Sequence, residues 1–297
     1  IGAGYVGLEM AEALGRRGVE VSVVEKEDGV MGGVEPKITE MVLEELEAHG
    51  IRLHLSTTVQ GFEGENGRVR SVVTDQGSFR ADLALLSLGV RPRSELAAEA
   101  GLALGPARAI HVNERQQTSD SNIWAAGDCA EAFHRVLGKP VYVPLALGAN
   151  RQGRVAGINM AGGEERFPGI LGSAVTRVFD LVISRTGIGE STAVTEGIPV
   201  ETIETTAASR AHYMPDHGPV WVKIVYRTDD LRVVGGWLCG HDPCAGKRAD
   251  ILATAIAADM TVLDVSDLDL SYAPPFAPVW DPVIQAANKA RFKLVGK

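Results

Sequence analysis

Residues 1–7 read IGAGYVG, a G-x-G-x-x-G pattern that joins the end of a β-strand to the start of a helix. In such a turn Gly2 allows the tight bend, Gly4 lets a pyrophosphate approach the backbone, and Gly7 lets the helix pack on the sheet. Only Ile1 precedes the glycines. We therefore expect this stretch to bind a dinucleotide. We also expect the strand before it, and a substantial N-terminal part, to lie outside this sequence.

The residues after the glycines follow the pattern of a dinucleotide-binding unit. Residues 5–17 predict a helix with Val6 on its apolar face. Residues 19–24 predict a buried parallel strand that ends at Glu25, roughly 20 residues past the glycines. A carboxylate at this point binds ribose hydroxyls and repels the 2′-phosphate of NADPH, so Glu25 favours NADH. Lys26 beside it weakens that preference.

The next segments continue the alternation of helices and strands. We expect a helix over residues 36–50, a strand at residues 51–55, and a small antiparallel meander with an Asn-Gly turn at residues 66–67. A further buried strand is expected at residues 83–88. This order of elements predicts a nucleotide-binding domain at residues 1–92.

Composition and charge are typical of a globular, cytoplasmic protein of roughly two domains. The 297 residues are 45% apolar and 23% charged, with a net charge of −9 and no prominent basic cluster. These values argue against binding to nucleic acid or to an anionic membrane surface. No apolar run approaches the roughly 20 residues of a membrane span. The histidines and the three cysteines show no metal-binding spacing, so we expect no metal site.

A second motif lies at residues 118–128, which read TSDSNIWAAGD. Gly127 permits a close approach of the backbone, and Asp128 offers a carboxylate to a ligand that carries hydroxyl groups. From the residues alone, a surface turn in which Asp128 caps a helix is the alternative.

Four motifs occur in order and at suitable intervals: GAGYVGLEMAE at 2–12, LGVRP at 88–92, IWAAGD at 123–128 and ANRQGR at 149–154. With them the chain resembles the flavin-dependent pyridine nucleotide-disulfide oxidoreductase family over essentially its whole length. The resemblance implies FAD and NAD(P)H as cofactors.

The resemblance also implies an α/β fold in three parts. These are a Rossmann-like NAD(P)-binding domain at residues 1–92, the C-terminal half of an FAD-binding domain at 93–168, and an α+β dimerisation domain at 169–297. The first half of the FAD domain, with its redox-active cysteine, would precede this sequence.

The family's cofactor contacts transfer to matching positions of this chain. Asp128 resembles the residue that bonds the ribityl chain of FAD. Tyr5 resembles the aromatic residue that covers the flavin until nicotinamide displaces it, and Glu9 resembles a carboxylate near the nicotinamide. Without the family, Tyr5 and Glu9 also suit ordinary helix N-terminal positions. The residues expected to contact FAD or NAD(P)H are Gly2, Gly4, Tyr5, Gly7, Glu9, Glu25, Gly89, Gly127, Asp128, Pro144, Leu145 and Ala146.

The segment at residues 270–276, LSYAPPF, is the candidate catalytic feature. Its two prolines favour an extended conformation that presents Tyr272 in one orientation. It resembles the tail of CoA-disulfide reductases and of related NADH oxidases and persulfide reductases, in which the tyrosine reaches the partner subunit's active site. Tyr272 is therefore the expected proton donor, with a packing role as the alternative. No histidine follows His241, which disfavours the glutathione and lipoamide branches.

The resemblance implies a homodimer that passes hydride from NAD(P)H through FAD to a disulfide, such as CoA disulfide, or to a persulfide. An NADH oxidase or peroxidase on the same scaffold is one alternative, and a non-catalytic NAD-binding dimeric module is another. Cys239 and Cys244 have dithiol spacing before a helix whose dipole could lower a thiol pKa. A redox role for this pair is a minor alternative, since the family's redox cysteine lies elsewhere.

Overall fold

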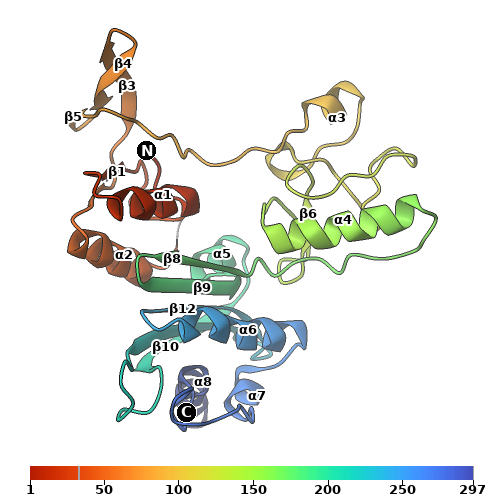
Figure 1. The fold of residues 1–297 in the computed structure, drawn as a ribbon. Helices are drawn as coiled ribbons and strands as arrows, with labels where there is room; N and C mark the ends of the chain where they lie inside the picture. The colour runs from red at the N-terminus through yellow and green to blue at the C-terminus, as the bar shows by residue number, and fades with distance from the viewer. Residues whose placement is uncertain (33, 297) are drawn as a thin grey trace.

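The helix predicted after the glycine fingerprint is confirmed, whereas Ile1 and Gly2 before it are not part of a strand. In the computed structural model, which describes residues 1–32 and 34–296, helix α1 (Tyr5–Gly15) begins directly after Gly4. Helix α2 (Pro36–Ala48) begins at a proline, whose fixed φ suits the first helical position. It connects strands β1 (Ser22–Val24) and β2 (Arg52–His54), which pair in parallel (Figure 1).

Ile1 and Gly2 lie beside this two-stranded sheet and hydrogen-bond to it without forming a strand. The Gly2 amide donates to the Val24 carbonyl at 2.8 Å, which places the first residues beside β1. On the other side, the Ile1 amino group donates to the Leu85 carbonyl at 2.8 Å, and the Ser87 amide donates to the Ile1 carbonyl at 2.8 Å. This alternation is the pattern of parallel neighbours.

The prediction of a buried strand at residues 83–88 is wrong. The segment is extended but forms no strand, and Leu83, Leu86 and Leu88 are 68%, 58% and 72% exposed. Within the described parts of the chain, Ile1 supplies its only backbone hydrogen bonds. One neighbouring residue is too little to form a ladder or to cover the leucines.

Two boundaries in the first unit also differ from the prediction. Helix α1 ends at Gly15, and its buried stripe contains Gly7, Leu8 and Ala11. Val6, expected on the apolar face, is 57% exposed because it lies about 100° around the helix from Gly7. The strand predicted at residues 19–24 is confirmed only for β1, since Val19 precedes it and is half exposed.

The meander is confirmed, with one strand more than predicted. Strands β3 (Val59–Glu65) and β4 (Arg68–Thr74) form an antiparallel hairpin around the Asn66-Gly67 turn. Strand β5 (Gly77–Arg80) pairs with β4 on its other side. The three strands project from the rest of the chain (Figure 1).

The middle of the chain forms a small unit of its own, on the right of Figure 1. Its small core contains Ala132, Val155 and Phe167. Its elements are α3 (Glu95–Glu99), a 3-10 turn (Pro106–Arg108), β6 (Ala132–His134), β7 (Lys139–Val141) and α4 (Ala146–Met160).

The C-terminal part is a five-stranded antiparallel sheet with the strand order β10-β11-β12-β9-β8. The strands are β8 (Ala174–Val178), β9 (Leu181–Gly187), β10 (Val200–Ala208), β11 (Pro219–Arg227) and β12 (Val233–Gly240). The helices are α5 (Glu190–Thr195), α6 (Cys244–Ala257), α7 (Val262–Ser266) and α8 (Pro282–Val295).

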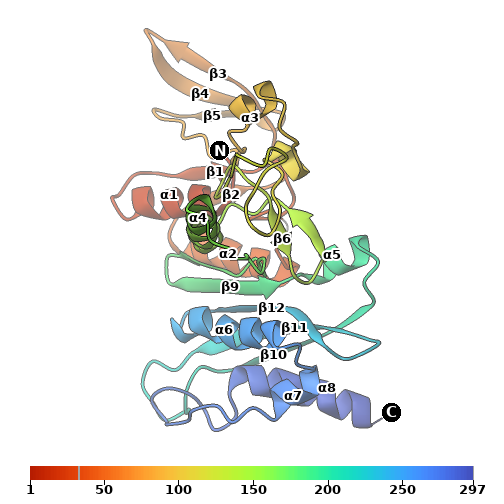
Figure 2. The same cartoon turned by 90° about the vertical axis from the view of Figure 1, so that its right-hand side faces the viewer.

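This sheet is covered on both faces, as the layers in Figure 2 show. Helices α6 and α8 pack on one face, and α1 and α2 pack on the other. Trp221 and Trp237 belong to the same core as Leu8 of α1 and Val42 of α2. Helices α1 and α2 and the C-terminal sheet therefore share one hydrophobic core. No helix in the described residues is long and apolar enough to cross a membrane.

An ion-pair cluster reinforces the same junction. The Lys223 ammonium on β11 lies 2.7 Å from a carboxylate oxygen of Glu35, just before α2, and 2.7 Å from one of Glu190 on α5. Burial alone lowers the pKa of Lys223, but the two carboxylates outweigh it, so that its pKa is raised and the group stays charged.

Candidate cofactor sites

The three glycines of the fingerprint have different surroundings. A Cβ on Gly2, whose φ is +97°, would lie 2.2 Å from the Ser87 carbonyl oxygen. A Cβ on Gly7 would lie 1.9 Å from the Gly2 carbonyl oxygen. A Cβ on Gly4 would meet no atom within 4 Å. Gly2 and Gly7 thus let the loop and the helix pack together, whereas Gly4 borders open space.

The start of α1 is suited to an anion. No side chain caps the helix, and the residue before it is Gly4, which borders that open space. Uncapped amides and the helix dipole favour negative charge at such an end. The loop therefore fits the pyrophosphate of a dinucleotide.

Glu25 lies at the end of β1, beside this loop. Its Oε2 accepts a hydrogen bond from the Ala3 amide at 2.7 Å, and its Oε1 accepts one from the Glu27 amide at 3.0 Å. Two backbone amides fix the carboxylate while leaving lone pairs for a ligand hydroxyl. The Lys26 side chain is exposed, and its ion pair is with Glu27 at 3.9 Å.

Tyr5 and Glu9 occupy the first turns of α1. Tyr5 is partly buried against the shared core. Glu9 Oε1 accepts a hydrogen bond from the Thr176 hydroxyl of β8 at 3.4 Å. Gly89 is exposed, with φ +89°, in the extended segment after Leu88.

The second motif forms a tight loop against α4. Gly127 has φ +80°, and its amide donates to Gln152 Oε1 at 3.1 Å. The Tyr142 hydroxyl donates to the Asp128 carbonyl at 3.1 Å. Asp128 is exposed, and its carboxylate has no hydrogen-bond partner in the described parts of the chain. The acidic group is therefore free to accept from the hydroxyls of a ligand.

Pro144, Leu145 and Ala146 lead into α4, whose first turn lies beside this loop. A Cβ on Gly127 would be 3.6 Å from Ala149 Cβ. Leu145 precedes the helix without a side-chain cap, so the first amides of α4 are uncapped. A free carboxylate and an uncapped helix start fit a polyhydroxylated, partly anionic cofactor such as FAD.

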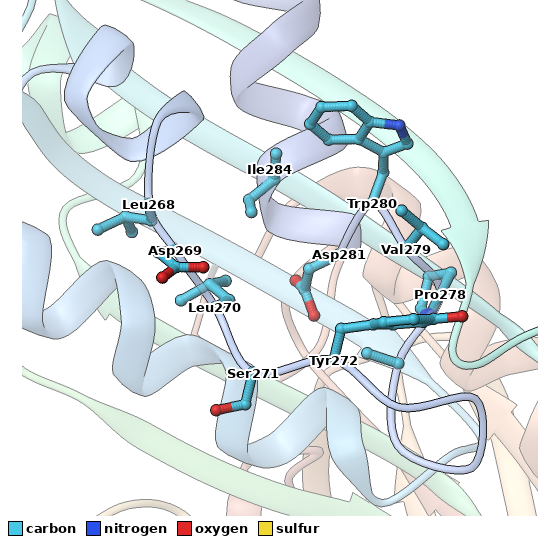
Figure 3. Close-up of a pocket in the computed structure, with 11 residues that line it drawn as sticks. Leu268, Asp269, Leu270, Ser271, Tyr272, Pro278, Val279, Trp280, Asp281 and Ile284 are labelled. Carbon is cyan, nitrogen blue, oxygen red and sulfur yellow. The ribbon is translucent and has the colours of Figure 1, made fainter.

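Tyr272 borders a hollow of about 240 Å³ between α7 and α8, together with Trp280 and Asp281 (Figure 3). Its side chain is half exposed, and its hydroxyl has no partner in the described residues. Arg248 on α6 binds the loop between α7 and α8 at two points. Its Nε donates to Asp281 Oδ2 at 2.6 Å, and its Nη2 donates to the Phe276 carbonyl at 3.2 Å. The residues that line the hollow come from the loop between α7 and α8 and from α8 itself, which packs on the sheet face opposite to α1.

The minor alternative of a redox role for Cys239 and Cys244 is disfavoured, because the pKa of each thiol is raised and not lowered. Burial raises the pKa of Cys239 to about 12 and that of Cys244 to about 12. The Arg248 charge opposes the shift at Cys244 and is outweighed. His241 Nε2 donates a hydrogen bond to Glu45 Oε2 at 2.8 Å. The described residues contain no group of three side chains that could hold a metal ion.

The structure thus gathers the predicted residues into two loops and one separate hollow. Gly2, Gly4, Gly7 and Glu25 lie around the start of α1, whereas Gly127 and Asp128 lie in a loop against α4, the helix that residues 144–146 begin. Sequence reasoning missed the contacts of Ala3, Thr176 and Gln152 with these loops. A glutamine on the buried side of α4 was the available signal for Gln152.

Sequence profiles of known families match most of the chain. Residues 1–153 match the pyridine nucleotide-disulphide oxidoreductase profile, and residues 173–282 match the dimerisation domain of the same family.

Individual relatives agree with these matches. The chain is 41% identical over 293 residues to an NAD(P)H coenzyme A polysulfide/persulfide reductase of Pyrococcus horikoshii, which covers 98% of this chain and 65% of the relative. It is 37% identical over 298 residues to an NADH oxidase of Methanocaldococcus jannaschii, covering 100% of this chain and 66% of the relative. The chain thus spans about 65% of the length of the curated relatives that it matches.

Solved structures show the same fold. An NAD-dependent persulfide reductase from A. fulgidus superposes with a TM-score of 0.95 at 38% identity, over 99% of this chain and 55% of that one. A water-forming NADH oxidase from Lactobacillus brevis, bound to NADH, superposes with a TM-score of 0.93 at 28% identity, over 99% and 65% of the two chains.

Proposed function

Because the chain belongs to the pyridine nucleotide-disulphide oxidoreductase family, we propose that the protein is a flavin-dependent oxidoreductase that uses NAD(P)H to reduce a sulfur–sulfur bond, such as that of CoA disulfide or a persulfide. One observation carries the proposal: the same chain contains two loops that could each bind part of a cofactor. The first borders the open space at Gly4, and the second presents the free Asp128 carboxylate. The choice of acceptor is supported by relatives named as an NAD(P)H coenzyme A polysulfide/persulfide reductase and as a CoA-dependent NAD(P)H sulfur oxidoreductase.

In this proposal the residues of the chain bind the two cofactors and orient them. The uncapped start of α1 would hold the dinucleotide pyrophosphate, and Glu25 would accept from the adenosine ribose hydroxyls, which favours NADH. Asp128 would accept from a hydroxyl of the flavin side chain. When bound, the nicotinamide and the flavin supply the hydride and electron transfer. Tyr5 would cover the face of the flavin ring until the nicotinamide displaces it, and Glu9 would lie near the nicotinamide.

Formation of a dimer would bring Tyr272 to the cofactor site of the partner subunit. We assign NAD(P) binding to residues 1–92, the C-terminal FAD half to 93–168 and dimerisation to 169–297. A two-fold dimer through the last region presents the same patch on both subunits. It would direct Tyr272 of one subunit to the other's site, where its phenol donates a proton to the leaving thiolate.

The test is steady-state turnover of the full-length protein. Without oxygen, NADH oxidation should depend on added CoA disulfide or persulfide, the purified protein should carry flavin absorbance, and sedimentation should show a dimer. A colourless protein that binds no flavin would contradict the enzyme assignment and favour the non-catalytic NAD-binding module.

The second candidate is an NADH oxidase or peroxidase. It is favoured by the M. jannaschii and L. brevis relatives, which carry the oxidase name and cover the same residues. Rapid NADH oxidation with oxygen or peroxide alone, together with no stimulation by any disulfide, would select this function.

A further inference from the structure

One side-chain amide holds both ends of the loop that carries Asp128. Gln152 is on α4 and is 3% exposed. Its Oε1 accepts from the Gly127 amide at 3.1 Å, and its Nε2 donates to the Glu131 carbonyl at 2.7 Å. Asp128 lies between the two points that this amide ties together.

The loop between these points is a tight turn. Its first residue, Gly127, has φ +80°, and its carbonyl accepts from the Ala130 amide at 2.9 Å. Ile110 pairs with the far end, since its amide donates to the Cys129 carbonyl at 2.8 Å. The backbone around Asp128 is thus fixed on several sides, while the carboxylate itself is left free.

The two hydrogen bonds of Gln152, which we call the Gln152 clamp, require a side-chain amide of this length. The Gly127 amide needs an acceptor and the Glu131 carbonyl needs a donor, and both are served by the ends of a single group. A glutamate keeps the acceptor but not the donor, and a methionine keeps neither. Because Gln152 is buried, a backbone group that loses its hydrogen bond to this side chain cannot form one with water instead.

We propose that Gln152 is a positioning residue of the flavin site: its clamp on Gly127 and Glu131 sets the direction in which Asp128 presents its carboxylate to the hydroxyls of FAD. The inference rests on the proposed function, because it needs FAD as the ligand. A carboxylate whose loop is preset loses less conformational freedom on binding, so the clamp contributes to FAD affinity without touching FAD.

Asn159 provides a matched control on the same helix. It is 8% exposed, and its Nδ2 donates to the carbonyls of Arg115 and Glu165, both at 2.9 Å. Its Oδ1 accepts from the Glu165 amide at 2.8 Å. It is therefore a buried, fully bonded amide in α4 that touches no part of the Asp128 loop.

The experiment compares Gln152→Met, Gln152→Glu and Asn159→Leu in the full-length protein. FAD dissociation constants are measured on the apoprotein by flavin fluorescence, and unfolding is followed in urea. We expect Asn159→Leu to lower stability with an FAD dissociation constant within about twofold of the unmodified protein. Both Gln152 variants should weaken FAD binding by about 10-fold or more, the size of a lost buried hydrogen bond, and should shift the bound-flavin absorbance.

The outcomes are separable. Unchanged FAD affinity in the folded Gln152→Glu protein would overturn the inference, as would an equal loss in Asn159→Leu. If Gln152→Met does not fold, the decision rests on Gln152→Glu, which keeps the size and the acceptor. Failure of the unmodified protein to bind FAD would instead contradict the proposed function.

Discussion

The substitution Gly4→Ala should separate cofactor binding from folding. A Cβ at this position would meet no atom within 4 Å, and the backbone, with φ −74° and ψ 179°, suits any residue. Stability should therefore stay the same or rise by about 0.4–1 kcal/mol, because alanine restricts the unfolded chain. The methyl would instead occupy the space through which a pyrophosphate approaches the start of α1. Overpacking of about 1–3 kcal/mol predicts a 5- to 150-fold loss of NADH affinity, in order of magnitude.

Gly7→Ala is the matched control, with the opposite expectation. Its Cβ would lie 1.9 Å from the Gly2 carbonyl oxygen, so the loop or α1 would have to retreat by about 1 Å or more. The neighbour is backbone, which cannot rotate away as a flexible side chain can. We expect Gly7→Ala to lower the free energy of unfolding by about 3 kcal/mol or more.

The assay is NADH binding by titration calorimetry on each variant, with urea unfolding of the same preparations. The reasoning is refuted if Gly4→Ala binds NADH as tightly as the unmodified protein, since the open space would then not be the dinucleotide site. It is also refuted if Gly7→Ala is as stable as Gly4→Ala.

Three further predictions concern separate parts of the chain. Glu25→Ala should reduce the preference for NADH over NADPH by about 2 kcal/mol, the scale of a hydrogen bond to a charged group. The measurement is kcat/KM with both coenzymes, and a tenfold NADPH preference before substitution would contradict it. Tyr272→Phe should lower disulfide turnover about 10²-fold while changing the free energy of unfolding by less than about 0.5 kcal/mol, because the hydroxyl has no partner in the described residues. Unchanged turnover, measured beside stopped-flow flavin reduction, would point to packing instead. Since burial raises the pKa of Cys239 and Cys244 to about 12, their thiolates form only as pH rises toward that value. Iodoacetamide at about pH 8 should leave both unmodified in the native protein, and a disulfide between them after mild oxidation would be incompatible with this account.

Patterns that depend on neighbouring residues were predictable from the sequence. The glycine loop before Tyr5, the helix start at Pro36 and the hairpin at Asn66-Gly67 all follow from local backbone preferences. These preferences act within a few residues and need no partner. For the same reason the candidate residues of the first loop could be assigned before the fold was known.

Burial and side-chain pairing depended on segments far apart in sequence. The buried strand expected at residues 83–88 failed because apolar composition does not say whether anything covers a segment, and little in the described chain covers this one. Strand β11 shows the reverse case. Its residues from Val220 to Tyr226 are all buried, because α8 covers one face and the core shared with α1 and α2 covers the other.

The sequence by itself therefore determined where the glycine turn and the helix after it lie, because turns and helix starts are encoded by adjacent residues. Only the tertiary structure decided which remote groups hold the candidate cofactor loops in place. Gln152 lies 25 residues from Gly127 and 21 from Glu131, yet its amide bonds both. Likewise, Trp221 and Trp237 share a core with Val42 and Leu8, although 179 residues separate Trp221 from Val42 and 229 separate Trp237 from Leu8. Such pairings follow from chain packing, which brings together groups that no local pattern relates.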